Sequence, residues 1–340
     1  MQRRSDLTGS ISSVSGDRLN EVSVSSLESA LQGRSAGVYV DQGGNKPGDG
    51  ASIRIRGNRS ITANNDPLFV VDGVPVSGGI RDLNPQDVES IEILKDASAT
   101  AIYGARGSNG VVLVTTKRGY DGDVSVRYDG SVGFSDMLRR VPMMNGEQWA
   151  DVRREAFRAA GNPTPDESLF HPTELEQIQN GTWTDYQDMI TQRGIRQEHQ
   201  LGISGGNSST RYHVSFGALD HNGILAPENF QRYNTRLNLD IDISDQFRIG
   251  TSTLGSYSIQ DGSTVNFYQE AVMNTPLTQP YDENGQLRLE PKPDAQRTNP
   301  LLEVLPESYV DEQKIQRILL SLIHTPSPRD QRGSRMPSSA

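Results

Sequence analysis

The sequence of 340 residues contains no cysteine, which excludes disulfide frameworks, thiolate metal sites and cysteine nucleophiles. It also lacks any apolar run near the roughly 18 residues that a membrane-spanning helix needs, and only 34% of its residues are hydrophobic. Transmembrane strands are still allowed, because such a strand turns only every second residue toward lipid and its average hydropathy stays low. No apolar segment follows the basic start Gln2-Arg3-Arg4, so no export signal is visible.

Positive charge is scarce as well, since 33 Lys and Arg residues stand against 43 Asp and Glu and give a formal net charge of -10. We therefore expect no nucleic-acid partner. The five histidines lack a spacing such as H-E-x-x-H, so no metal site is expected. Gly104, Gly107 and Gly110 match neither G-x-G-x-x-G nor a Walker lysine pattern, which argues against a nucleotide cofactor. No carboxylate pair stands out as a glycosidase dyad, and we expect no enzyme.

The first 119 residues predict one compact α+β unit, because short helical and strand-like pieces alternate between glycine-bearing breaks. Ser25 and Ser26 can cap a first short helix, and Asn84-Pro85 opens a helical turn. A second short helix is predicted over Ala97–Tyr103, ending at Gly104. The β-rich runs are Val38–Val40, Ser52–Arg56, Leu68–Val71, Ile91–Leu94 and Val111–Thr116.

From Asp123 onward the pattern changes to long apolar/polar alternation, the period of a sheet whose two faces meet different media. In the clearest case, Arg232–Ile243, Tyr, Thr, Leu and Ile at odd positions alternate with Arg, Asn and Asp at even positions. We count five such strands: Val124–Phe134, Gln197–Gly205, Arg211–Leu219, Arg232–Ile243 and Phe247–Ile259.

The connections between these strands alternate in length, as they do in outer-membrane barrels, which have long extracellular loops and short periplasmic turns. Residues 135–196 form a long connection, 206–209 a short one, 222–229 an intermediate one and 244–246 a tight one, and the stretch after residue 260 is long again. In the first long connection, Asn145 and Gln148 form a capping-box pattern that predicts a helix.

Several blocks resemble the plug domain of the SusC/RagA family of TonB-linked outer-membrane proteins, in the order that this family uses. They are Leu31–Val38 (LQGRSAGV), Ile53–Gly57 (IRIRG), Pro67–Pro75 (PLFVVDGVP), Leu83–Gly104 (LNPQDVESIEILKDASATAIYG) and Lys117–Gly119 (KRG). The resemblance extends into the alternating half through Asn145-Gly146-Glu147, residues 212–217 and residues 234–242.

The resemblance implies an α+β plug domain over residues 1–119, followed over residues 120–320 by the first antiparallel strands of a transmembrane β-barrel of about 22 strands. Residues 321–340 turn to Pro, Ser and Arg and are expected to be non-native read-through of adapter DNA, with a native disordered tail as the alternative. Relative to the family, the signal peptide, the N-terminal carboxypeptidase-regulatory-like domain, the TonB box and most barrel strands are missing. We therefore expect an N-terminal fragment that does not transport alone.

For function, the resemblance implies TonB-dependent import of a glycan oligosaccharide or a peptide across the outer membrane of a Gram-negative, Bacteroidetes-like cell. The implied partners are TonB, a SusD-like surface lipoprotein, the substrate and outer-membrane lipid, with no cofactor. The alternative is a soluble β-rich carbohydrate-binding module, in which one face of the alternating strands packs in a sandwich.

Four residues are candidate contact sites. Arg54 and Arg56 alternate with Ile53 and Ile55, so their guanidiniums point away from the plug core and can pair with barrel carboxylates, or form a solvated edge. Trp183 and Tyr186 in the first long connection can stack on a ligand.

Two further features have structural readings. Asp72-Gly73 is a hairpin-turn signal in which Gly73 takes positive φ, most simply a structural role. Tyrosines on the alternating apolar face are expected in an interfacial belt, although a soluble sheet also accepts them. These tyrosines are Tyr128, Tyr212, Tyr233 and Tyr257.

Overall fold

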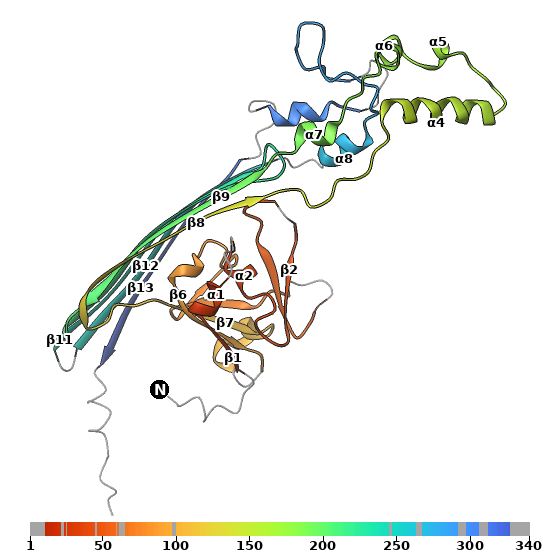
Figure 1. Ribbon diagram of the computed structural model, residues 1–340. Coiled ribbons are helices and arrows are strands. Elements are labelled where there is room, and N and C mark those ends of the chain that lie inside the picture. Colours follow the sequence, from red (N-terminus) through yellow and green to blue (C-terminus); the bar gives the residue numbers. More distant parts are fainter. Residues whose placement is uncertain are drawn as a thin grey trace, which may run out of the picture.

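The computed structural model describes residues 11–21, 24, 26–44, 46–58, 60, 65–96, 100–244, 247–262, 267–291, 297–305 and 312–326. The described residues up to 119 fold into a small α+β body, the N-terminal unit, and the described residues after it form a long curved sheet with short helices gathered at one end (Figure 1). Each helix among the described residues is too short or too polar to cross a bilayer.

The N-terminal unit is built on a five-stranded sheet with the order β1-β6-β7-β4-β5. Its strands are β1 (Ile11–Ser15), β4 (Leu68–Val71), β5 (Val74–Val76), β6 (Val88–Leu94) and β7 (Val111–Thr116). A separate hairpin pairs β2 (Val38–Gln42) with β3 (Ala51–Ile55). The helices are α1 (Gly16–Leu19), α2 (Leu27–Ala30) and the 3₁₀ segments η2 (Pro85–Asp87) and η3 (Ala101–Gly107). The predicted α+β unit and its five β-rich runs are therefore confirmed.

Local signals explain most of these boundaries. The Ser26 side chain accepts a hydrogen bond from the Ser29 backbone N–H at the start of α2, and Asn84 caps η2 in the same way through Gln86. The second predicted helix ends at the wrong place. Gly104 adopts φ 60° and ψ -146°, which kinks η3, but the helical turns resume and continue to Gly107. Residues 97–99, its predicted beginning, lie outside the described residues.

The core of the N-terminal unit lies between its sheet, α1, α2 and the β2–β3 hairpin. Ile53 and Ile55 are 1% and 2% exposed, so the predicted inward face of β3 is confirmed. The other members of this buried cluster come from nearly every element, including Leu19, Leu27, Ile91 and Val112. Burial of such side chains stabilises each by about 1.5–3 kcal/mol relative to exposure.

The second half of the chain forms a six-stranded antiparallel sheet, β13-β12-β11-β10-β9-β8, which does not close on itself. Its strands are β8 (Gly122–Ser135), β9 (Gly194–Gly206), β10 (Thr210–Asn222), β11 (Asn229–Ser244), β12 (Phe247–Asp261) and β13 (Gln313–Pro326). The five predicted strands are all present, but the count was wrong by one, because β13 was not recognised. This strand runs through the expected domain boundary at residue 320. Residues 327–340 lie outside the described residues, so their non-native origin stays a prediction.

The long connections leave the same end of the sheet, where they carry the helices (Figure 1). Between β8 and β9 these are α4 (Gly146–Ala159), α5 (Asp166–Leu169), α6 (Pro172–Asn180) and α7 (Tyr186–Ile190), and between β12 and β13 they are α8 (Phe267–Met273) and η4 (Pro300–Val304). The capping box predicted for Asn145 and Gln148 is present at the start of α4. The three-residue link from β9 to β10 lies at the opposite end.

The burial pattern of the large sheet is inverted relative to a soluble sheet. On β11, Arg232, Asn234 and Arg236 are 0%, 4% and 1% exposed, whereas Tyr233 and Leu237, at alternating positions, are 49% and 37% exposed. The N-terminal unit lies against the concave face of the sheet (Figure 1), and side chains such as Ser215, Asn234 and Arg236 form hydrogen bonds or ion pairs with it. The apolar side chains of the opposite face stay exposed, among them Val126, Phe134, Phe216, Ile318, Leu320 and Leu322.

The tyrosines of the large sheet follow the same division. Tyr128, Tyr233 and Tyr257 are 63%, 49% and 39% exposed, and Tyr233 lies directly opposite Tyr257 in the register of β11 and β12. Tyr212 pairs with Leu239 and so shares their face. All four predicted positions therefore lie on the outer, apolar face.

Candidate functional site

The contact between the N-terminal unit and the concave face of the sheet is the most unusual surface of the molecule, because it is buried and yet mostly polar. Buried polar groups require partners, since an unsatisfied one costs about 1–3 kcal/mol. The side chains that the sheet contributes are Glu198, Gln200, His213, Ser215, Arg232, Asn234, Arg236, Asn238, Ser256, Ser258 and Gln260. We call this contact the polar interface, and three groups of residues build it.

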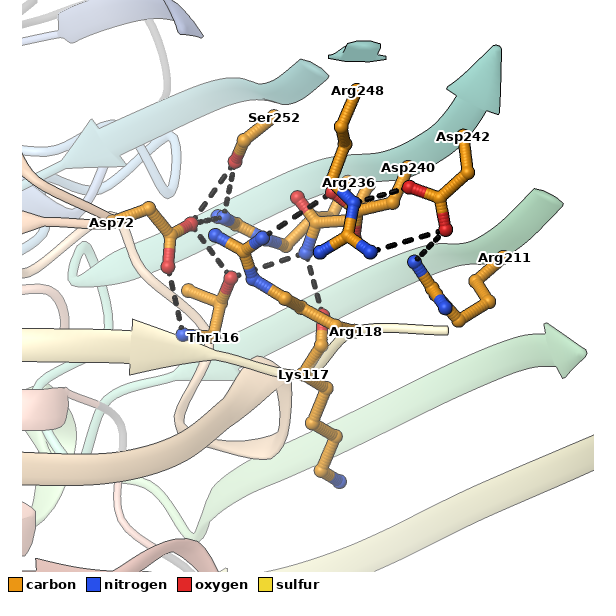
Figure 2. A network of polar contacts seen from close by, with 11 residues as sticks. Asp72, Thr116, Lys117, Arg118, Arg211, Arg236, Asp240, Asp242, Arg248 and Ser252 are labelled. Carbon is orange, nitrogen blue, oxygen red and sulfur yellow. Dashed lines mark hydrogen bonds and ion pairs between the residues drawn. The ribbon is translucent and has the colours of Figure 1, made fainter. Parts of the chain in front are cut away.

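The first group surrounds Asp72, which occupies the turn between β4 and β5 (Figure 2). Asp72 and Gly73 have φ values of 47° and 86°, so the predicted hairpin turn is confirmed. The Asp72 carboxylate forms an ion pair with Arg236, and it accepts hydrogen bonds from the Thr116 backbone N–H (3.0 Å) and from the Thr116 hydroxyl (2.7 Å). Ser252 of β12 donates a further hydrogen bond to it (3.0 Å). A turn residue of the unit is thus bound to two strands of the sheet.

The second group surrounds Asp87, which ends η2 and is 1% exposed. Its carboxylate accepts hydrogen bonds from Gln200 (2.7 Å) and Ser215 (2.6 Å), and Asn234 donates a longer one (3.4 Å). Gln200 also accepts a hydrogen bond from the Asn84 side chain (2.7 Å). Burial raises the pKa of the Asp87 carboxyl, although the Ser215 hydrogen bond and the positive charge of Arg236 oppose the shift.

The third group lies toward β13. Glu28 and Asp82 of the unit are 3% and 2% exposed, and burial raises the pKa of Glu28. Arg317 of β13 ion-pairs with Asp82 (3.2 Å) and donates to the Gly79 carbonyl (2.9 Å), while Arg232 donates to the Arg81 carbonyl (2.9 Å). Carboxylates on the unit therefore face guanidiniums on the sheet. Because a buried charge is tolerated only when paired, this arrangement specifies how the two bodies fit together.

The polar interface is not packed throughout. Two cavities of about 390 and 190 Å³ lie between the unit and strands β8–β10, and Lys117, Arg127 and Asp129 line both. Each is large enough to hold water. Burial lowers the pKa of Lys117 beside them. Among the described residues, no group of three or more His, Asp or Glu side chains is placed to bind a metal ion.

The predicted contact residues Arg54 and Arg56 lie outside the polar interface. Arg56 pairs with Asp96 (2.5 Å) within the same unit. Arg54 lies in β3, and Arg56 directly follows the last residue of that strand. The pairing of Arg54 and Arg56 with barrel carboxylates stays a prediction, which concerns barrel strands other than β8–β13.

The two predicted stacking aromatics have different environments. Trp183 is 53% exposed and lines a cavity of about 250 Å³ among the helices at the end of the sheet, together with Arg140, Met143 and Asn145. Tyr186 is only 3% exposed and packs with Ile190, Ala271 and Leu301. Its hydroxyl is hydrogen-bonded to Thr278 (2.9 Å), and burial raises the pKa of Tyr186 to about 12. Tyr186 also lines the same cavity as Trp183, so its stacking on a ligand stays a prediction.

Sequence reasoning missed the residues that build the polar interface. Asp72 was interpreted as a turn residue alone, and Asp87 was not singled out. One signal was available, because Arg232 and Arg236 share one face of β11, and two arginines on an inward face require buried carboxylates elsewhere.

Comparison with known proteins agrees with this arrangement. The family model "TonB-dependent Receptor Plug Domain" matches residues 3–111, which cover most of the stretch up to residue 119. TonB-dependent receptor SusC of Bacteroides thetaiotaomicron is 38% identical over 246 residues, which are 70% of this chain and 23% of that protein. TonB-dependent receptor P26 of Formosa agariphila is 38% identical over 292 residues, 84% of this chain and 28% of that protein. The chain belongs to the TonB-dependent receptor family.

Within this family the SusC/RagA resemblance is confirmed by structure as well. The RagAB peptide importer in its "open-open" state superposes with a TM-score of 0.80 and 27% identity, over 96% of this chain and 40% of that one. The N-terminal unit is thus a plug domain, and the open sheet corresponds to the first strands that follow it. The chain spans about a quarter of the length of the two curated relatives.

Proposed function

We propose that this chain is the plug-bearing part of a TonB-dependent importer, which carries a nutrient across the outer membrane of a Gram-negative, Bacteroidetes-like bacterium. The observation that carries the proposal is the inverted sheet. Its apolar side chains face outward with no covering layer among the described residues, while its polar side chains are buried against the plug. A wall between lipid and an aqueous lumen requires this inversion. The soluble carbohydrate-binding alternative requires the apolar face to be covered.

The orientation follows from the same reasoning. The end of the sheet with long, helix-bearing connections is extracellular, and the end with the three-residue link between β9 and β10 is periplasmic, as in other outer-membrane barrels. The plug then blocks the lumen from the periplasmic side. Import requires the plug to move or rearrange, with energy that TonB supplies. No enzymatic activity is expected.

For substrate and partner, we propose a glycan oligosaccharide or a peptide, captured with a SusD-like or RagB-like surface lipoprotein. Support comes from the likeness to SusC and to a protein described as the RagAB peptide importer. The exposed Trp183 ring beside its cavity is a candidate for stacking on such a substrate. Arg54 and Arg56 are candidates for contacts with further barrel strands.

A growth experiment tests this proposal. The gene is deleted at its natural locus, and the mutant is compared with the parent and with a strain lacking TonB, on panels of oligosaccharides and of peptides as sole nutrients. We expect the deletion to abolish growth on members of one panel, with the same loss in the TonB strain. Unchanged growth on both panels, together with recovery of the protein from the soluble fraction, contradicts the proposal and favours the binding module.

A further inference from the structure

A further cavity, of about 660 Å³, lies in the plug beside the edge strand β13 of the sheet. Its walls are residues 50–53, which lead into β3, residues 66–69, which lead into β4, and residues 76–79, which end β5 and follow it. At its margin Arg317 of β13 donates to the Gly79 carbonyl (2.9 Å). We call it the β3–β5 cavity. Its volume lies in the range of about 300–1,000 Å³ that small-molecule sites occupy.

Glu28 lines this cavity with a carboxylate that is only half satisfied. Its Oε1 accepts a hydrogen bond from the Ile80 backbone N–H (3.0 Å), whereas its Oε2 is buried and has no hydrogen-bond partner among the described residues. The neighbouring Asp82 has a counter-charge in Arg317 (3.2 Å), but within the described part of the chain no ion pair reaches Glu28. Burial raises the pKa of the Glu28 carboxyl. Because a buried carboxylate is tolerated when it is paired, this one calls for a cationic donor.

Two guanidiniums border the same cavity, those of Arg81 and Arg106. Arg106 is exposed, and Arg81 forms only a long ion pair with Asp82 (3.8 Å). The cavity therefore offers charges of both signs to a ligand. A ligand with a cation at one end and carbonyl or carboxylate oxygens further along complements this arrangement, whereas a ligand of a single charge meets repulsion from one side.

The floor of the β3–β5 cavity is apolar. The side chains that form it are Ile53, Leu68, Phe69 and Val76, which are 1%, 8%, 7% and 6% exposed. Such a floor can receive an apolar side chain of the ligand, because ligand sites combine an apolar lining with a few polar groups that fix the orientation.

The strand β3 adds main-chain groups to this lining. Side chains of successive strand residues point to opposite faces, so the successive lining residues 50–53 mean that the cavity borders the strand at its edge. The hairpin order β2-β3 gives β3 a neighbour on one side only, among the residues that the structure describes. An extended peptide can pair with such an open strand edge through its own main chain.

We propose that the β3–β5 cavity binds the amino-terminal end of an extended peptide, with the peptide ammonium group on Glu28, its main chain along β3 and a peptide oxygen on Arg81 or Arg106. The inference rests on the proposed function and deepens it, because it selects a peptide from the two nutrient classes and places a peptide site in the plug. A neutral oligosaccharide lacks the cation that Glu28 requires.

Acetylation of the ligand tests the ammonium contact without any change in the protein. The complete receptor is purified in detergent from its natural host, and the tripeptide alanyl-leucyl-alanine and its N-acetyl form are titrated by calorimetry. We expect the acetylated form to bind about tenfold or more weakly, because acetylation removes the charge that pairs with Glu28. Equal affinity of the two forms, or no binding of the free tripeptide, overturns the proposal.

Glu28→Gln assigns the discrimination to one side chain. The glutamine keeps an oxygen for the Ile80 N–H and removes the charge, so the two tripeptide forms should bind within about twofold of each other. Glu89→Gln is the matched control, since Glu89 is an exposed carboxylate of β6 outside the cavity, and it should keep the wild-type discrimination. Discrimination that persists in Glu28→Gln overturns the site.

A second variant keeps the test valid even when Glu28→Gln does not fold. Ser77 is an exposed residue of the cavity wall, so Ser77→Trp should block the cavity and weaken binding of the free tripeptide by about tenfold or more. Unchanged affinity in this variant overturns the site.

Growth and binding together separate the two proposals. If the deletion strain loses growth only on oligosaccharides and the tripeptide does not bind, the peptide site is wrong and nutrient import stands. If Glu28 discriminates the two tripeptide forms while growth is unchanged on both panels, the peptide site stands and the import function is wrong.

Discussion

Asp72 and Arg236 form an ion pair in which the two side chains are 3% and 1% exposed, although 164 positions separate them in the sequence. One belongs to a turn of the plug and the other to the middle of a sheet strand. Ser252 connects the pair further, because it accepts a hydrogen bond from Arg236 (2.8 Å) and donates one to Asp72 (3.0 Å). The pair therefore couples the folding of the plug turn to its position in the sheet, and it yields a first prediction.

Replacing Asp72 with Asn should destabilise the protein strongly, because the buried Arg236 loses the carboxylate with which it forms its ion pair. Removal of one partner from a buried pair costs about 3–5 kcal/mol. The expected result is a large fall in the thermal unfolding midpoint of the detergent-solubilised protein, measured by calorimetry. Asp129→Asn is the control, since its pair with Arg127 is exposed and such pairs contribute about 0–1 kcal/mol. Equal midpoints for Asp72→Asn and the wild type would show that the pair is not formed.

The stability of the plug should depend on pH through Asp87. Burial raises the pKa of this carboxyl in the folded protein above the ordinary 3.8, so the folded state binds the proton more tightly than the unfolded state. The resulting stabilisation is complete below the ordinary value and is lost as pH rises through the folded pKa. Asp87→Asn should remove this component, so the difference in unfolding midpoint between wild type and variant should change across that window. A constant difference from about pH 4 to about pH 8 contradicts the prediction.

The space around Asp87 also depends on a glycine. A Cβ atom on Gly217 would lie 2.3 Å from the amide oxygen of Gln200 and 2.6 Å from that of Asn234. The amide nitrogens of these two side chains donate hydrogen bonds to Asp87. Gly217→Ala should displace these amides and cost about 1–3 kcal/mol, measured as a shift of the unfolding midpoint. In Gly255→Ala, on β12, the added atom meets nothing within 4 Å, so this variant should behave like the wild type. If the two alanine variants lose the same stability, the loss in Gly217→Ala does not come from displacement of the Gln200 and Asn234 amides around Asp87.

The sequence predicts features that depend on local patterns, and it does not predict contacts between residues that lie far apart in the chain. The period-two alternation of β11 assigns each side chain to one of two faces, and both assignments are correct. The same pattern carries no information about what a face touches, so the partners of Arg236 and Asn238 could not be named. The strand β13 was missed because both of its faces are apolar in part: Leu319 points inward to the plug core, while Leu320 points outward. The apolar/polar alternation is therefore absent where a strand of the sheet packs on an apolar part of the plug, as β13 does.

A substitution on the outer face of the sheet can test whether this face contacts lipid or water. Leu237 lies in the middle of β11 and is 37% exposed on that face. If the face contacts lipid, Leu237→Arg should cost about 2–4 kcal/mol and reduce the yield of folded protein in lipid vesicles. Leu138→Arg is the control, because Leu138 is fully exposed in the connection after β8. Equal vesicle yields for both variants would indicate that the outer face meets water instead.

Trp183 and Tyr186, three positions apart, should respond to substitution in opposite ways. Trp183→Ala removes an exposed ring beside its cavity, so it should weaken substrate binding and leave the unfolding midpoint nearly unchanged. Tyr186→Phe removes a buried hydroxyl and its hydrogen bond to Thr278, so it should destabilise the helical end of the sheet by about 0.5–1.5 kcal/mol and leave binding unchanged. Binding is measured by calorimetric titration with the nutrient identified in the growth experiment. A loss of affinity in Tyr186→Phe, at a temperature where the protein is fully folded, would show that the Tyr186 hydroxyl contributes to ligand binding.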